Sequence, residues 1–230
     1  MARAADVATA RAGDTDGMSH VAPESLAFRP VGRTRGLRNL TRALDTVVDA
    51  FDDPNVLAQR VGIVLRSALA NPDLLEARHQ EPWVRRYRPH LVHVHPEGRY
   101  SIVALVWQPG QRTPIHDHRC WCVVGVWRGQ ERETTYDVYC DGDSPYLVER
   151  GSAVYRPGSV SVLVPPDEDV HRVENTGDRL AVSLHVYGDD ISVLGSSINR
   201  TFGDELVRQD AGSGVPASWR SLDAQSPLAA

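Results

Sequence analysis

Three histidines in the second half of the chain have the residue type and spacing of a metal site. His116 and His118 are separated by one residue, and His171 opens a later apolar segment. Residues i and i+2 of a strand project from the same face, so the first two imidazoles can reach one metal ion. A lone His-x-His pair is as often polar filler in a loop, but a barrel can bring the third histidine to the pair. Imidazole binds iron, zinc, copper and nickel alike, so the residues alone do not select the metal.

A second set of polar side chains alternates along one predicted strand. Ser183, His185 and Tyr187 would point the same way and form a hydrogen-bonded row. An amphipathic strand with a solvent face would show the same alternation. The opposite phase, however, is apolar, and we expect it to pack outward under helices or a second sheet: Val182, Leu184 and Val186. The polar row is therefore predicted to face an internal cavity.

The elements that must hold these residues are two helices followed by many strands. Apolar residues recur at three- and four-residue steps from Leu37 to Phe51 and from Val56 to Leu69, which predicts two amphipathic helices packed on their own domain. Beyond Pro82, short β-rich runs alternate with turn residues. The runs are Leu91–His95, Tyr100–Trp107, Trp121–Trp127, Thr134–Tyr139, Val160–Val164, Val170–Val173 and Leu180–Val186. Their regular spacing predicts a mainly β, antiparallel double-sheet barrel or jelly roll.

We expect one domain between two ends of a different composition. The first residues contain almost no large apolar side chain and are interpreted as a flexible leader. The tail returns to Ser, Ala, Pro and Gly, apart from a Leu206-Val207 patch and Trp219, and is expected to be loop or a strap over the barrel. The predicted parts are a leader at 1–36, a domain at 37–202 with helices in 37–79 and the barrel at about 83–195, and a tail at 203–230.

The composition excludes several classes of protein. With 25 Lys+Arg against 30 Asp+Glu, a formal net charge of −5 offers no basic field for nucleic acid or anionic lipid. Three cysteines in 230 residues are too few for a disulfide scaffold and indicate a reducing compartment. No stretch approaches the roughly 20 apolar residues of a membrane span, and no secretory signal is evident. We expect a cytoplasmic monomer or weak homo-oligomer without a nucleic-acid or membrane partner.

The spacing around the histidine pair resembles the first motif of the cupin superfamily. The residues at the motif's positions are Gly110, His116, His118, Cys122 and Gly129. Cys122 stands where the motif normally has a metal-binding Glu. The segment 171–175, His-Arg-Val-Glu-Asn, is similar to the core of the second cupin motif, although the preceding Pro-x-Gly is degraded to Pro-Asp-Glu at 166–168. A cupin with Cys in place of that Glu resembles the thiol dioxygenases, of which cysteine dioxygenase is the best known.

The resemblance extends over about residues 83–200 and includes the family's Ser-x-His-x-Tyr strand. It implies a cupin double-stranded β-helix with the N-terminal α-helices packed on it. It also implies Fe(II) on three histidines without a carboxylate, and dioxygen as co-substrate. The implied metal ligands are His116, His118 and His171, and the implied catalytic residues are Ser183, His185, Tyr187 and Cys122. Omission of a carboxylate ligand leaves a larger positive charge, which favours a bound thiolate.

The implied reaction is the oxidation of a small thiol by dioxygen to the sulfinic acid, with L-cysteine as the expected substrate. A 3-mercaptopropionate-type thiol dioxygenase stays open, as does a specialised relative that makes another oxidised sulfur product from cysteine. A cupin that senses a metal or small molecule without turnover is a second alternative, because fold alone does not decide function. The retained polar row favours chemistry, since a sensor needs no proton relay.

The residue that would bind the substrate carboxylate is less clearly marked. Cysteine-specific members of the family use an Arg in a Tyr-x-Arg context on the strand before the metal motif. Here Arg88 adjoins Tyr87 directly and is the nearest match. A guanidinium is the natural bidentate partner of a carboxylate, so we expect Arg88 to bind the substrate. Arg86, Arg112 and Arg200 are its rivals, and an Arg on a surface strand is often only solvated.

Cys122 has a further implied role. It occupies the position from which some cysteine dioxygenases form a thioether to the tyrosine of the Ser-x-His-x-Tyr strand, here Tyr187. If the strand is regular from the metal motif onward, its sulfur should point into the iron cavity. The simpler interpretation is a small buried core residue, as free cysteines usually are. We expect a partial Cys122–Tyr187 crosslink that raises the rate without being essential.

Overall fold

Two helices form where the apolar periodicity predicts them. Helix α1 spans Arg35–Ala50 and α2 spans Pro54–Leu69. The Thr34 hydroxyl caps α1 by accepting from the Leu37 amide, and the Asp53 carboxylate caps α2 by accepting from two amides of its first turn. Such caps satisfy backbone donors that have no partner inside the helix. The local sequence therefore determines where both helices begin.

The start of α1 corrects the predicted boundary of the leader. The structure, a computed structural model, describes residues 34–166, 169–210, 212 and 215–216, so residues 1–33 and Trp219 lie outside the described residues. The helix begins at Arg35 rather than after residue 36, and Gly36 is buried within it. A Cβ at position 36 would overlap the backbone carbonyl of Asp73. Close approach of two backbones therefore explains a glycine that composition alone assigned to the leader.

The strands form two sheets whose pairings are antiparallel, except for β11 with β6. One sheet has the order β1 (Arg88–Val94), β2 (Ser101–Trp107), β9 (Ala181–Tyr187), β4 (Cys122–Arg128) and β7 (Val160–Leu163). The other has the order β10 (Ile198–Phe202), β3 (Ile115–His118), β8 (His171–Glu174), β5 (Glu131–Asp141), β6 (Ser144–Tyr155) and β11 (Val207–Arg208), and β12 (Val215–Pro216) pairs with β5. Short helical turns lie at η1 (Ala77–Gln80), α3 (Ile191–Leu194) and η2 (Asp204–Leu206). This mainly β double-stranded β-helix with packed N-terminal helices is the predicted fold class.

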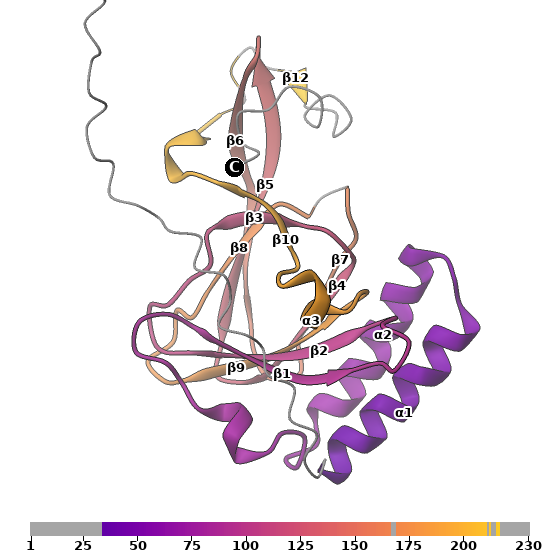
Figure 1. The fold of residues 1–230 in the computed structure, drawn as a ribbon. Coiled ribbons are helices and arrows are strands. Elements are labelled where there is room, and N and C mark those ends of the chain that lie inside the picture. The colour runs from indigo at the N-terminus through magenta and orange to yellow at the C-terminus, as the bar shows by residue number, and fades with distance from the viewer. Residues whose placement is uncertain (1–33, 167–168, 211, 213–214, 217–230) are drawn as a thin grey trace, which may run out of the picture.

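The five-stranded sheet is apolar on both faces, which explains its unbroken apolar strands. In β2, Ile102, Ala104 and Val106 pack outward in one core with the leucines of α1 and α2. The alternate residues pack inward with β4, β8 and β9: Val103, Leu105 and Trp107. Figure 1 shows both helices against this sheet. The helices thus cover the outer face and leave the inner face to line the barrel.

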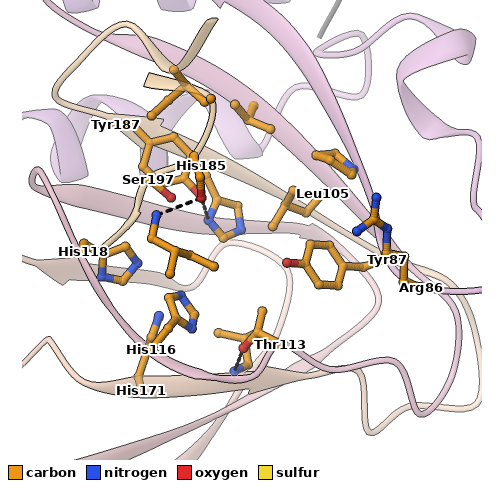
Figure 2. A pocket seen from close by; sticks show the side chains of 17 residues that line it. Arg86, Tyr87, Leu105, Thr113, His116, His118, His171, His185, Tyr187 and Ser197 are labelled. Carbon is orange, nitrogen blue, oxygen red and sulfur yellow. Dashed lines mark hydrogen bonds between the residues drawn. The ribbon is translucent and has the colours of Figure 1, made fainter. Parts of the chain in front are cut away.

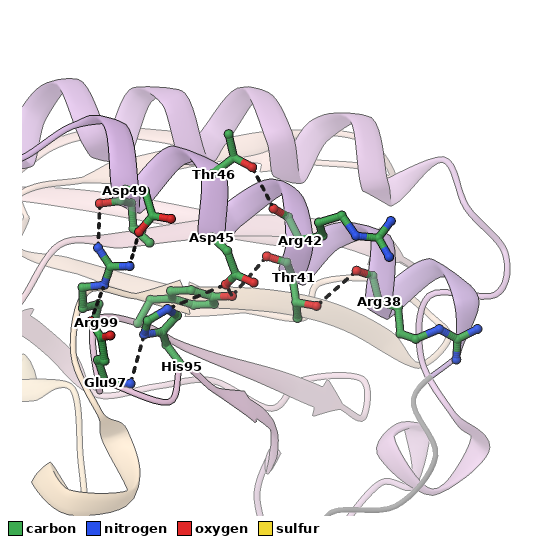
Figure 3. Close-up of polar contacts among 11 residues, drawn as sticks. Arg38, Thr41, Arg42, Asp45, Thr46, Asp49, His95, Glu97 and Arg99 are labelled. Atoms are coloured by element: carbon green, nitrogen blue, oxygen red, sulfur yellow. Dashed lines mark hydrogen bonds and ion pairs between the residues drawn. The ribbon is translucent and has the colours of Figure 1, made fainter.

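Polar contacts hold α1 to the turn between β1 and β2 (Figure 3). The Tyr100 hydroxyl donates to Asp45 Oδ1 at 2.6 Å. The Arg99 guanidinium donates to the Val48 carbonyl at 3.0 Å and pairs with Asp49. Tyr100 is fully buried, so its hydroxyl needs such a partner. These contacts position the helix relative to the sheet more narrowly than apolar packing alone.

The second sheet contains strands that the apolar pattern missed. β6 includes a long exposed stretch and pairs along β5 in a hairpin whose outer end projects from the barrel (Figure 1). β10 pairs with β3, so the barrel continues beyond the predicted limit of 195 to Phe202. The described part of the tail pairs with the same hairpin through β11 and β12. No helix among the described residues is long and apolar enough to cross a membrane.

Candidate metal centre and pocket

The pairing of β3 with β8 brings the three histidines together. His116 and His171 are direct cross-strand partners, and His118 lies on the same face of β3 as His116. The ring centroids are 4.7 to 5.0 Å apart, and one nitrogen of each ring lies within 4.8 Å of the other two. All three side chains are buried. Sequence reasoning placed these residues in one site, and the structure juxtaposes them.

Neighbouring acceptors orient two of the three rings. His171 donates from Nδ1 to Glu133 Oε1 at 2.6 Å, and His116 Nδ1 lies 3.0 Å from the Pro114 carbonyl oxygen. Each bond leaves Nε2 as the ring's remaining polar atom, and Nε2 of His171 is buried without a hydrogen-bond partner among the described residues. A buried polar atom without a partner is costly unless something binds it. This orphaned nitrogen beside two further imidazoles fits a metal ion.

A different carboxylate lies beside the third ring. The Asp169 carboxylate accepts from the His118 amide at 2.8 Å and lies 3.5 Å from its Nδ1. Burial lowers the pKa of His118 and holds the pKa of His116 well below its ordinary value. Both rings are consequently neutral at physiological pH, which is the form of imidazole that binds a metal.

A buried ion pair fixes the strand that carries the first two histidines. Asp117 lies between them in sequence and accepts from the Arg200 amide at 2.6 Å and from its guanidinium at 2.7 and 2.8 Å. These bonds join β3 to β10. Arg200, one of the rivals for the substrate carboxylate, therefore serves the framework rather than the pocket.

The three histidines line a pocket of about 450 Å³ (Figure 2). Its walls are largely apolar, and the non-histidine lining residues include Tyr87, Val103, Leu105, Thr113, Tyr187, Ile191 and Ile198. In Figure 2 the three histidines lie together at one side and Arg86 at the other. A pocket of this kind, apolar with a few polar groups that converge, is typical of small-molecule sites.

The polar row predicted on β9 is present and reaches this pocket. Ser183 Oγ lies 3.0 Å from His185 Nε2, and the Tyr187 hydroxyl lies 3.2 Å from His185 Nδ1. Burial lowers the pKa of His185 to about 3 and raises that of Tyr187 well above its ordinary value. The imidazole and the phenol are thus both neutral. The donor and acceptor roles along the row can therefore reverse while both groups stay neutral.

Cys122 lies behind the row rather than in the pocket wall. β3 ends at His118 and β4 begins at Cys122, so the strand is not regular from the metal motif onward. Cys122 is the cross-strand partner of Tyr187, and its sulfur lies 4.0 Å from His185 Nδ1. Burial raises the pKa of the thiol well above its ordinary value, so Cys122 is a thiol and not a thiolate.

The arginine assignment needs correction. Arg88 pairs with Glu81 at 3.3 Å on the exposed side of β1 and does not line the pocket. Successive residues of a strand face opposite sides, and this places Arg88 outward. Arg112 pairs with Asp204, also outside the pocket. Arg86 is the one arginine among the described lining residues, and its guanidinium lies 5.1 Å from the Trp83 ring centroid.

Sequence reasoning missed the carboxylates that surround the histidines. Glu133 accepts from His171, and Asp169 accepts from the His118 amide. Burial opposes ionisation of Glu133, but hydrogen bonds from His171, Ser161 and Tyr155 leave its pKa below the ordinary value. The signal that was present is the pair Glu131-x-Glu133, two acids in one phase of a strand. It was overlooked because the predicted strand began at Thr134.

Comparison with known families finds a match to the model of cysteine dioxygenase type I over residues 39–194. The matched segment contains the three histidines, Cys122 and the whole Ser-His-Tyr row. It also includes most of α1 and all of α2, so the match covers the helices as well as the barrel.

Solved structures show a more distant likeness. A double-stranded β-helix protein from Klebsiella pneumoniae is 15% identical, with a TM-score of 0.39 over 53% of this chain and 94% of that one. A cupin 2 conserved barrel domain protein from Salinispora arenicola is 18% identical, with a TM-score of 0.37 over 52% and 89%. Oxalate decarboxylase from Bacillus subtilis is 20% identical, with a TM-score of 0.36 over 52% and 32%.

The contact between Glu133 and His171 generates a prediction about metal affinity. Glu133→Gln keeps the shape but removes the charge that orients the ring and makes it more basic. We expect divalent metal to bind roughly 10- to 100-fold more weakly, as for other carboxylate partners of ligating histidines. Anaerobic titration with Fe(II) or Co(II) measures this. Glu149→Gln, which alters an exposed acid on β6, is the control, and equal affinities in the two variants would contradict the assignment.

Proposed function

Because the chain belongs to the cysteine dioxygenase type I family, a family of cupin-type dioxygenases, we propose that it is an iron-dependent dioxygenase of a small thiol. L-cysteine is the expected substrate and the sulfinic acid the expected product. The observation that carries the proposal is the union of three buried imidazoles with a buried Ser-His-Tyr row in one pocket. His116, His118 and His171 would hold the iron, which supplies the redox chemistry that joins dioxygen to sulfur.

The donor set explains the choice of a thiol. No carboxylate is among the three groups that converge on the site, because Glu133 and Asp169 engage the far sides of the imidazoles. Neutral ligands leave the full charge of the ion uncompensated, which favours the thiolate form of a substrate. Cys122 stands where a ligating Glu would otherwise reduce that charge.

The remaining pocket residues would bind and orient the substrate and dioxygen. Apolar side chains from β2 and α3 form walls beside the histidines. Tyr187 presents its hydroxyl to that space from the β9 side, held by His185. A fixed hydroxyl beside apolar walls can make a directed hydrogen bond to the substrate or dioxygen.

Arg86 replaces Arg88 as the proposed partner of the substrate carboxylate. It lines the pocket, packs over Trp83 and makes no ion pair with the described residues. Arg88, in contrast, is already engaged by Glu81. An unpaired guanidinium at the edge of an apolar pocket is suited to a carboxylate in bidentate geometry.

The function is tested by oxygen uptake with the iron-loaded protein. We expect consumption of dioxygen with L-cysteine and a product heavier than the thiol by two oxygen atoms. Parallel reactions with 3-mercaptopropionate and cysteamine identify the preferred thiol, and the product mass separates sulfinate from other oxidised sulfur. If none of the three thiols supported uptake, the proposed activity would be wrong and a metal- or ligand-sensing cupin would be favoured.

The position of Arg86 predicts a selective loss of affinity. Arg86→Gln should raise the KM for L-cysteine roughly 10- to 100-fold, because a charge-assisted hydrogen bond contributes about 1.5–3 kcal/mol. The KM for cysteamine, which has no carboxylate, should change little. Arg88→Gln is the matched control and should leave both values near those of the unaltered protein. Equal effects of Arg86→Gln on the two thiols would exclude the carboxylate contact.

The cross-strand pairing of Cys122 with Tyr187 supports the expected thioether. Joining the sulfur to the phenol ring removes one hydrogen from each group, with dioxygen as oxidant. Mass spectrometry of a proteolytic digest should therefore find a linked peptide pair two hydrogens lighter than its separate parts, in a fraction that grows with turnover. Cys122→Ala should abolish the linked pair. Its absence from the unaltered protein after many turnovers would rule out the crosslink.

A further inference from the structure

Glu131, at the start of β5, is a buried acid that the proposed function does not use. Its side chain is 2% exposed. Neither carboxyl oxygen makes a hydrogen bond of ordinary geometry among the described residues, and the Ser183 hydroxyl is the one side-chain donor close enough to affect its pKa. A buried carboxylate without a cation or donor would be strongly destabilising. Either the acid is un-ionised, or it has a partner in some working state of the protein.

The surroundings of Glu131 favour the un-ionised acid. A small internal cavity borders it, lined also by Val124, Val126, Glu133, Tyr155, Ser159, Ser161 and Val173. The titratable groups facing it are Glu133 on its own strand, Tyr155 on β6 and, beyond Ser183, His185 on β9. No cationic side chain is among the described residues that line the cavity. Burial, with a smaller contribution from the Glu133 carboxylate, raises the pKa of Glu131 to about 8, and the Ser183 hydroxyl opposes part of this rise. At neutral pH the acid therefore carries its proton.

Ser183 connects this acid to the polar row. Its Oγ accepts from Trp107 Nε1, a group that can only donate, at 3.2 Å. The same oxygen lies 3.0 Å from His185 Nε2 and next to the Glu131 carboxyl. A hydroxyl has one proton to donate and two lone pairs to accept with. With one lone pair taken by Trp107, Ser183 can donate to Glu131 or to His185, but not to both.

The protonation state of Glu131 therefore decides the direction of every bond in the row. If Glu131 is un-ionised, it donates to Ser183, and Ser183 donates to His185 Nε2. The neutral ring then has its proton on Nδ1 and donates to the Tyr187 oxygen, which turns the phenol O–H away from His185, toward Ser197 and the pocket that both residues line. If Glu131 is ionised, each bond reverses, and Tyr187 uses its proton on His185.

We propose that Glu131 is a positioning residue that sets the direction of the Ser183–His185–Tyr187 row, so that Tyr187 offers a hydrogen-bond donor to molecules in the pocket. The catalytic consequence rests on the proposed function. The direction of the row does not, because it is a property of the chain without metal or substrate. The two can therefore fail separately.

The test is the tautomer of His185, read by nitrogen-15 NMR on the metal-free protein. We expect the proton on Nδ1 well below pH 8 and on Nε2 well above it, with a midpoint near the pKa of about 8. His185→Gln identifies the signal. A single tautomer across this range in the unaltered protein, or Nε2 protonated at the lower pH, would overturn the proposal.

A variant assigns the change to Glu131 itself. Glu131→Gln preserves the shape but cannot ionise, so the His185 tautomer should no longer depend on pH, whereas Glu149→Gln should behave as the unaltered protein. If Glu131→Gln does not fold, the titration of the unaltered protein still decides the direction. A tautomer change that survives unaltered in Glu131→Gln would place the controlling proton elsewhere.

Turnover gives the functional readout. In the iron-loaded protein, kcat should fall as pH rises through about 8, and this limb should be lost in Glu131→Gln with KM little changed. Comparison with the same thiol removes the contribution of substrate ionisation. If the His185 tautomer switches but no thiol is oxidised, the proposal for the row stands and the proposed function is wrong. Thiol oxidation with the same pH limb in both proteins would defeat the role of Glu131 in turnover.

Discussion

The short pairing between β3 and β8 is the contact on which the rest of the site depends. It sets His116 opposite His171, and the strand period then places His118 on the same face. A shift of one residue would turn the imidazoles to the other side of the sheet. Asp117 prevents such a shift, because its ion pair with Arg200 ties β3 to β10 from the opposite face. The geometry of the metal-binding groups is therefore held by backbone register and by a charge pair that does not enter the pocket.

The surroundings of two buried acids in this barrel give them different charges. Glu133 is ionised because it receives several donors, while Glu131, two residues away in the same strand phase, has only the Ser183 hydroxyl nearby and keeps its proton. Low dielectric surroundings make the difference between these outcomes large. One carboxyl thus orients a metal-binding ring, and its neighbour is available to direct a hydrogen-bonded row.

The pocket combines apolar walls with few polar contacts. Arg86 is the one Lys or Arg side chain among its described lining residues. Its packing over Trp83 fixes the side chain while leaving its donors unpaired. In the proposed function, recognition of the thiol would divide between the histidine side of the pocket, which would bind sulfur, and the guanidinium side, which would bind the carboxylate. Arg86 and the histidine pair lie at different sides of this pocket and come from separate segments of the chain.

The sequence by itself determined the helices, the β-rich barrel, the three histidines and the Ser-His-Tyr row, because these follow from local periodicity and from motif spacing. It did not decide which arginine faces the pocket, because on one regular strand Arg86 and Arg88 would share a face; β1 begins only at Arg88, and Arg86 lies in the bend before it. It also missed β6 and β10, whose residues are held by pairing rather than by apolar pattern. The partners of Glu131 and Glu133 come from other strands. Only the tertiary structure decided their charge, because the pKa of a buried acid depends on groups distant in sequence.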